Sequence, residues 1–202
     1  MKAIQIGAIV LALSGLVSFN ASAADIEAGK SKTAVCAGCH GVDGNSTNPA
    51  WPSLAGQHAS YIYKQLKDFK EGRRNDPNMT GMVAGLNDDD MRNIAAFYET
   101  QSVKPIAFDA DLIAAGESIY RGGITETGVA ACMGCHAPAG TGNGPAAWPS
   151  LKSQHAPYIV AQLQNFKKGA RNNDAGSMMR NVVKRMSDEE MNAVAAYVAG
   201  IQ

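Results

Sequence analysis

The sequence predicts an all-α protein made of two similar helical domains in tandem. Three observations predict this fold: apolar residues recur at the helical period, one set of motifs occurs twice, and no run alternates apolar and polar residues as a strand does. A domain of roughly 80 residues has little core of its own. Each domain is therefore expected to fold around a further buried group.

The first 23 residues are typical of a secretory signal peptide. Lys2 supplies a positive charge, residues 4–17 form an uncharged apolar stretch, and Ala21-Ser22-Ala23 matches a cleavage site. The apolar stretch is shorter than the roughly 20 residues that span a bilayer. We therefore expect cleavage after Ala23 and export to the periplasm of a bacterium, with no membrane anchor retained.

The rest of the chain is a tandem duplication. Several motifs recur at a nearly constant offset, namely Cys36-Ala37-Gly38-Cys39-His40 and Cys132-Met133-Gly134-Cys135-His136, Trp51-Pro52-Ser53-Leu54 and Trp148-Pro149-Ser150-Leu151, Gln57-His58 and Gln154-His155, and Arg74-Asn75 and Arg171-Asn172. The repeat predicts a first domain over residues 24–100 and a second over residues 111–202. Between them, residues 101–110 form a linker marked by Pro105.

Each unit is expected to hold about three main helices joined by long irregular loops. Ile62, Leu66 and Phe69 fall at the i, i+4, i+7 positions of an apolar helix face. Asn87 before three aspartates is a candidate N-cap, and Ser187 opens a capping-box pattern. The stretches between the helices are rich in Gly, Asn and Pro, which favours loops.

The repeated C-x-x-C-H motif predicts covalent haem attachment. In this pattern two thiols add to the vinyl groups of one haem, and the adjacent histidine becomes the proximal iron ligand. The motif residues are Cys36, Cys39 and His40 in the first copy, and Cys132, Cys135 and His136 in the second. A redox disulfide or one zinc site shared by both motifs would not require the histidine. We therefore expect two covalently bound haem c groups.

The second axial ligand has to be chosen among nine methionines. Met91 and Met191 are equivalent, but they fall on the apolar face of the last helix of each unit, where packing is the default role. Met79 and Met179 are the equivalent pair expected in the loop before that helix. We therefore expect them to bind iron opposite the proximal histidines, which favours a high reduction potential.

His58 and His155 are the rival sixth ligands. They are the only other histidines and are equivalent to each other, so ligation of each iron by two histidines stays open. Each directly precedes a predicted helix, soon after Trp-Pro-Ser-Leu. A capping or loop-fixing hydrogen bond is therefore the expected role.

With these residues placed, the whole mature chain resembles the cytochrome c4 family of dihaem proteins. Beyond the haem motifs, the resemblance rests on the Gly- and Asn-rich loops that follow them, on Arg-Gly-Gly at residues 121–123 and on Cys-His-Ala-Pro at residues 135–138. It implies two tandem class I cytochrome c-like domains, each wrapped around one covalent haem. It also implies His/Met ligation, by His40 with Met79 and by His136 with Met179.

The resemblance has further implications for the surroundings of each haem. The carbonyls of Pro52 and Pro149 are expected to accept a hydrogen bond from the proximal histidines. Arg73, Arg74 and Arg171 are candidates for neutralising haem propionates near the domain interface, with a solvated basic cluster as the alternative. The second copy carries an insertion between residues 116 and 132, so the two haem environments are expected to differ.

An iron with both axial positions occupied has no place for a substrate, so we expect an electron carrier and not an enzyme. The resemblance implies a respiratory chain, with electrons arriving from a quinol-oxidising complex and leaving to a haem-copper terminal oxidase. The alternatives are a dihaem electron-transfer subunit of a dehydrogenase, a dihaem peroxidase and a ligand-binding sensor. The chain has 18 basic and 18 acidic residues, which argues against a nucleic-acid partner. Peripheral association with the membrane stays open.

Overall fold

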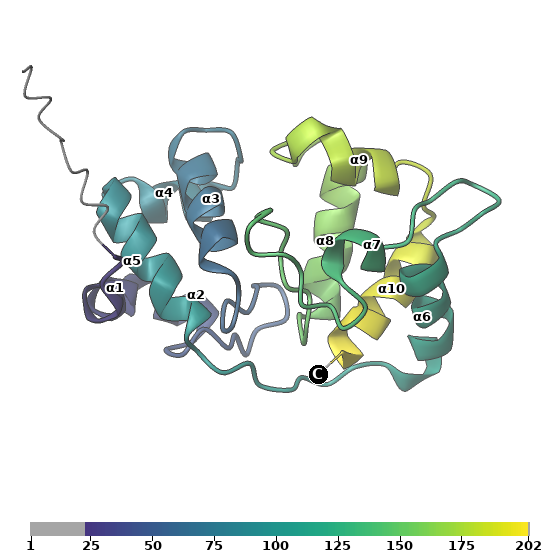
Figure 1. The fold of residues 1–202 in the computed structure, drawn as a ribbon, viewed down its shortest axis with the longest axis horizontal. Coiled ribbons are helices and arrows are strands. Elements are labelled where there is room, and N and C mark those ends of the chain that lie inside the picture. The colour runs from purple at the N-terminus through teal and green to yellow at the C-terminus, as the bar shows by residue number, and fades with distance from the viewer. Residues whose placement is uncertain (1–22, 202) are drawn as a thin grey trace, which may run out of the picture.

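The computed structural model describes residues 23–201 as two helical lobes joined by an extended segment that passes along one side of both (Figure 1). Nearly all of the predicted signal peptide, residues 1–22, lies outside the described residues. Within them, strand-like pairing is limited to two isolated bridges, Ile124 with Val129 and Asn143 with Trp148. The prediction of an all-α fold is confirmed. No helix in this part of the chain has both the length and the apolar character needed to cross a membrane.

The two lobes contain the same series of helices. The first lobe holds α1 (Ile26–Lys32), α2 (Ala37–His40), α3 (Ala59–Lys70), α4 (Pro77–Val83) and α5 (Asp88–Glu99). The second holds α6 (Ile113–Gly122), α7 (Met133–His136), α8 (Ala156–Lys167), α9 (Met178–Val183) and α10 (Asp188–Gly200). Short 3-10 turns cover Thr33–Val35, Ala110–Leu112 and Ala175–Ser177.

The prediction of about three main helices per unit was too low, because the short helices α4 and α9 replace part of the expected loops. Asp76 caps α4 by accepting hydrogen bonds from the backbone N–H groups of Asn78 and Met79, and Pro77 follows in the first turn. The predicted N-cap at Asn87 and the capping box at Ser187 are both confirmed. A cap and a proline can thus start a short helix within a segment whose composition favours loops.

The first and last helices of each lobe cross at a glycine. A Cβ atom on Gly29 of α1 would lie 2.1 Å from the backbone oxygen of Asn93 in α5. A Cβ atom on Gly116 of α6 would lie 2.0 Å from the backbone oxygen of Ala193 in α10. Both distances are far inside van der Waals contact, so only glycine lets the two backbones approach this closely.

Equivalent side chains fill the cores beneath these crossings. The first core contains Ile62, Phe69 and Met91, and the second contains Ile159, Phe166 and Met191. Met91 is 3% exposed and Met191 is 0% exposed, which confirms that these two methionines pack in the core. Each lobe therefore has its own hydrophobic core, as separate domains do.

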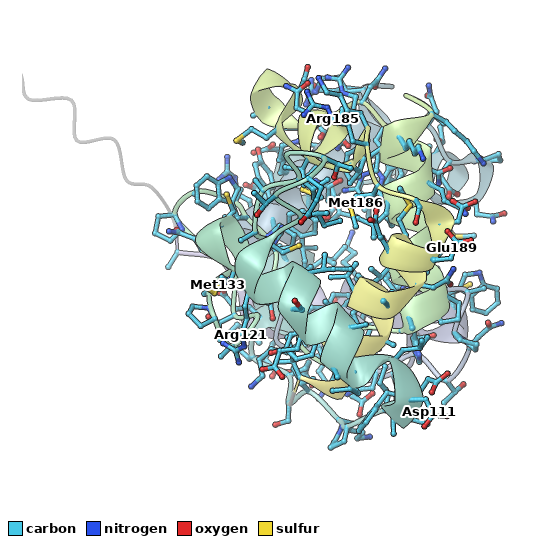
Figure 2. The ribbon with its side chains drawn as sticks, turned by 90° about the vertical axis from the view of Figure 1, so that its right-hand side faces the viewer. Asp111, Arg121, Met133, Arg185, Met186 and Glu189 are labelled. Atoms are coloured by element: carbon cyan, nitrogen blue, oxygen red, sulfur yellow. The ribbon has the colours of Figure 1, made fainter. Side chains whose placement is uncertain are left out.

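The insertion of the second copy forms a small loop that the first lobe lacks. The Ile124–Val129 bridge closes it, and the Arg185 guanidinium donates a hydrogen bond to the carbonyl of Thr127 at 2.7 Å. Figure 2 shows Arg185 at the rim of the second lobe, above the crossing of α6 and α10. Gly85 stands at the equivalent position of the first repeat. The surroundings of the two lobes therefore differ at this point.

The lobes face each other through α3 and α8, which lie on the sides turned toward one another (Figure 1). Two arginines form a cluster here with glutamines and tyrosines of both helices. Arg74 bonds to Gln65, Gln162 and Tyr158, and Arg171 bonds to Gln65, Gln162 and Tyr61. Each guanidinium also stacks on a phenylalanine of its own lobe. The contacts follow the approximate two-fold relation that the repeat implies.

One cluster breaks this symmetry. The Asp68 side chain is buried and accepts hydrogen bonds from Lys64, from Arg73 and from Asn173 of the second lobe. Burial alone would raise the pKa of Asp68, but these three donors outweigh it and hold the pKa below its ordinary value of 3.8. Asn165 and Ala161 occupy the equivalent positions of Asp68 and Lys64, so the second repeat has no such carboxylate.

The close helix crossings predict that a methyl group added at the crossing glycine lowers the stability of the fold. Gly116→Ala forces α6 away from α10 and is expected to lower the free energy of unfolding by about 1–3 kcal/mol. Gly122→Ala is the matched control in the same helix, because no heavy atom lies within 4 Å of its Cβ position. Denaturant unfolding followed by circular dichroism measures both variants. Equal effects of the two substitutions would refute the close crossing.

The Asp68 cluster predicts a stability difference that depends on pH. Because its pKa is depressed in the folded protein, the ionised group contributes its full stability above pH 3.8 and loses it as the pH falls through the lower folded value. Asp68→Asn is expected to lower the free energy of unfolding near neutral pH by about 1–3 kcal/mol, with the difference from the unmodified protein shrinking in acid. Urea titrations at several pH values measure it. Glu126→Gln, at an exposed position, is the control; a Glu126 effect of the same size and pH profile would contradict this account.

Candidate functional site

Each C-x-x-C-H motif occupies one helical turn. Cys36 directly precedes α2, which ends at His40, and Cys132 directly precedes α7, which ends at His136. The backbone N–H of each histidine donates to the carbonyl of the first cysteine of its motif at 2.9 Å. Residues at i, i+3 and i+4 share a helix face, so both sulfurs and the imidazole of a motif can serve one flat ligand.

The two histidines are buried and held in one tautomer. Nδ1 of His40 lies 2.8 Å from the carbonyl oxygen of Pro52, and Nδ1 of His136 lies 3.0 Å from that of Pro149. A carbonyl can only accept, so Nδ1 carries the proton and Nε2 keeps its lone pair. The expected bonds to the two prolines are confirmed. A neutral imidazole with a free Nε2 fits iron ligation.

Burial sets the protonation state of these histidines. It lowers the pKa of both His40 and His136, and the hydrogen bond to the proline carbonyl offsets only part of the effect. Both rings are therefore neutral over a wider pH range than an exposed histidine. This is the state in which a histidine binds a metal.

The first cysteine of each motif is in an apolar setting. Burial raises the pKa of the Cys36 thiol and raises that of Cys132 to about 11. Reactive cysteines in disulfide-exchange proteins have lowered pKa values instead. Within residues 23–201, moreover, no three His, Cys, Asp or Glu side chains lie close enough together to hold a metal ion. Both alternatives to haem attachment are disfavoured.

Met79 and Met179 are not in loops, as the sequence predicted, but in the first turns of α4 and α9. The prediction failed because Asp76 caps the first of these helices, where its carboxylate accepts a hydrogen bond from the Met79 backbone N–H at 3.1 Å. Both thioether side chains are partly buried and pack against the core of their own lobe. Their equivalence in the repeat is unaffected, and a helical turn positions them more rigidly than a loop.

His58 and His155 lie at the interface between the lobes. Nε2 of His58 is 2.7 Å from the carbonyl oxygen of Thr141, and Nε2 of His155 is 2.9 Å from that of Ser46. Neither side chain caps the helix that follows it. The expectation of a loop-fixing hydrogen bond is confirmed and that of a cap is wrong. Each ring holds a loop of the opposite lobe.

The three candidate arginines have different surroundings. Arg74 and Arg171 belong to the interface cluster, so the alternative of a solvated basic cluster is wrong for them. Arg73 is half-exposed and pairs with Asp68 and Glu71. A role for any of them beside haem propionates stays a prediction.

Two glutamines that sequence reasoning assigned no role lie close to the histidine sites. The Gln57 side chain bonds to both backbone polar groups of Ser150, and the Gln154 side chain does the same to Ser53. The only sequence signal was the recurrence of Gln-His in both copies. The repeated motif indicates that these glutamines matter, but only the structure shows which residue of the other domain each one contacts.

Comparisons with known proteins agree with this geometry. The family model described as Cytochrome c matches residues 26–102 and again residues 113–202. Cytochrome c4 of Azotobacter vinelandii is 41% identical, with 99% of each chain covered. The thiosulfate dehydrogenase electron acceptor of Stutzerimonas stutzeri is 38% identical, with 92% of this chain and 90% of the relative covered. The crystal structure of reduced recombinant cytochrome c4 from Pseudomonas stutzeri superposes with a TM-score of 0.86 at 43% identity, over 89% of this chain and 100% of the other.

Proposed function

The chain belongs to the cytochrome c4 family of dihaem electron carriers, and we propose that it passes electrons in the periplasm from a quinol-oxidising complex to a haem-copper terminal oxidase. Two covalently bound haem c groups are its cofactors, and it is an electron-transfer protein, not an enzyme. The observation that carries the proposal is the C-x-x-C-H turn, present once in each lobe with its buried histidine bonded to a proline carbonyl. Periplasmic export rests on the signal peptide pattern of residues 1–23.

The residues proposed to hold the haems share a place in the repeat. They are Cys36, Cys39, His40 and Met79 in the first domain, and Cys132, Cys135, His136 and Met179 in the second. Each haem iron, when bound, supplies a one-electron couple. The protein would tether the group through the two sulfurs of each motif, and would present a neutral Nε2 to one side of it and a thioether to the other. The soft thioether favours reduced iron and thus a high potential.

The proposed ligands at both axial positions of each iron would favour a carrier over the enzyme and sensor alternatives. A histidine and a methionine on each iron would leave neither a peroxide nor a gas an open position to bind. Electrons then enter and leave through the protein surface. Two such centres let one chain hold two electrons, or receive an electron at one haem and deliver it from the other.

A second candidate function is favoured by one of the comparisons. The relative from Stutzerimonas stutzeri is named as an electron acceptor of thiosulfate dehydrogenase. The same haem chemistry would serve that role, and only the electron donor would differ. Here the donor would be an enzyme that oxidises reduced sulfur compounds, instead of a quinol-oxidising complex.

The methionine assignment predicts a spectroscopic result. Met79→Ala and Met179→Ala are each expected to remove about half of the weak methionine-to-iron absorption band of the oxidised protein, and the double variant all of it, because each thioether binds one iron. Each single variant should also bind carbon monoxide at one haem when reduced. Met82→Ala and Met178→Ala are matched controls, since both side chains are exposed in the same short helices. A band that is absent from the unmodified protein, or that survives in the double variant, overturns the assignment.

The choice of partner predicts different electron-transfer rates. Stopped-flow absorption should show that membranes containing a cytochrome bc complex reduce the oxidised protein within one turnover of that complex, and that membranes containing a haem-copper oxidase reoxidise it. A purified thiosulfate dehydrogenase given thiosulfate should reduce it at least tenfold more slowly. The reverse order of rates would replace the proposed donor with the sulfur-oxidising enzyme.

A further inference from the structure

One peptide group of the first lobe, between Pro52 and Ser53, forms hydrogen bonds through both its carbonyl and its N–H. The carbonyl of Pro52 accepts the hydrogen bond of His40 Nδ1 at 2.8 Å. The N–H of the same peptide group belongs to Ser53, and it donates to Oε1 of Gln154 in the second lobe at 3.0 Å. A continuous line of two hydrogen bonds and one peptide group therefore joins the proximal histidine of one domain to a side chain of the other.

The second lobe contains the equivalent set of hydrogen bonds. The carbonyl of Pro149 accepts from His136 Nδ1 at 3.0 Å. The N–H of Ser150, in the same peptide group, donates to Oε1 of Gln57 at 2.8 Å. Each lobe thus reaches the histidine of the other through a single glutamine.

The two glutamines are fixed by further bonds. Nε2 of Gln57 donates to the Ser150 carbonyl, and Nε2 of Gln154 donates to the Ser53 carbonyl, both at 2.9 Å. Each Oε1 also accepts the backbone N–H of the histidine that follows the glutamine. Both side chains are 7% exposed. A buried amide with this many partners has one orientation, so its contact with the peptide group is well defined.

The peptide group transmits the effect of the glutamine to the histidine. A hydrogen bond donated by a peptide N–H increases the negative charge on the carbonyl oxygen of the same group, strengthening the next bond in the line by roughly 10–30%. A stronger acceptor draws the Nδ1 proton and leaves more electron density on the imidazole. That density stabilises oxidised iron more than reduced iron and so lowers the potential.

We propose that Gln154 is a positioning residue for His40 and Gln57 for His136, so that each domain sets part of the reduction potential of the haem in the other. This inference rests on the proposed function, because it takes the two histidines to be haem ligands. If each glutamine acts in this way, the contact between the two domains directly affects the reduction potentials of both haems. A role of the glutamines in holding the domains together would not produce this crossed pattern.

The test replaces one glutamine at a time by an apolar side chain of similar size. Gln154→Leu is expected to raise the potential of the His40 haem and leave that of the His136 haem unchanged, while Gln57→Leu does the opposite. The expected change is about threefold in the equilibrium constant for electron exchange between the haems. This corresponds to about 30 mV at 59 mV per tenfold change for one electron. Potentiometric titration followed by NMR, with signals assigned through the rings of His40 and His136, measures each haem separately.

A matched control separates tuning from adhesion between the domains. Gln162→Leu removes interface bonds to Arg74 and Arg171 without touching either Pro-Ser peptide group. It should leave both potentials, and both histidine Nδ1–H signals, unchanged. Equal shifts of both haems in all three variants, or no shift in any, would overturn the inference. The unmodified protein is measured first: if it lacks two haems with histidine and methionine ligands, the proposed function fails instead.

Discussion

The hydrogen bond from a buried histidine to a proline carbonyl is the constraint on which both sites depend. It fixes the ring tautomer, because a carbonyl cannot donate, and it leaves Nε2 free on the side away from the loop. Burial then keeps the ring neutral. The helical turn that brings two cysteines to the same face would be of little use without a histidine held in this way. The loop that provides the proline is therefore as much a part of the site as the motif itself.

The same loop also forms the interface between the domains. The serine that follows each proline is bound by a glutamine of the opposite domain, and a histidine next to that glutamine holds a second loop. This is the pattern of an isologous dimer, in which one surface patch contacts its own equivalent. Joining two such domains in one chain raises the effective concentration of each for the other. Two domains with small cores thereby share a polar interface that includes the buried side chains of Gln57 and Gln154.

Much of the fold could be predicted from the sequence, because repetition made the signals unambiguous. The haem motifs, the capped last helices and the packing role of Met91 and Met191 all depend on local patterns that occur twice. The short helix around Met79 was missed, since its cap at Asp76 lies in a segment whose composition favours loops. Gln154 and Arg171 could not be assigned their partners, because contacts between residues about 100 positions apart leave no local trace.

The near symmetry of the sites limits where a difference between the two haems can arise. The bonds from His40 and His136 to their prolines differ by 0.2 Å, at 2.8 and 3.0 Å, and the glutamine contacts are matched as well. A preferred direction of electron transfer must then come from residues that the repeat does not share. Among such residues are the buried Asp68 on the first side, where the second repeat has Asn165, and Arg185 on the second side, where the first has Gly85. The Asp68 charge is paired with Lys64 and Arg73, which the second repeat replaces by Ala161 and Ala170, so this cluster adds no net negative charge to the first side.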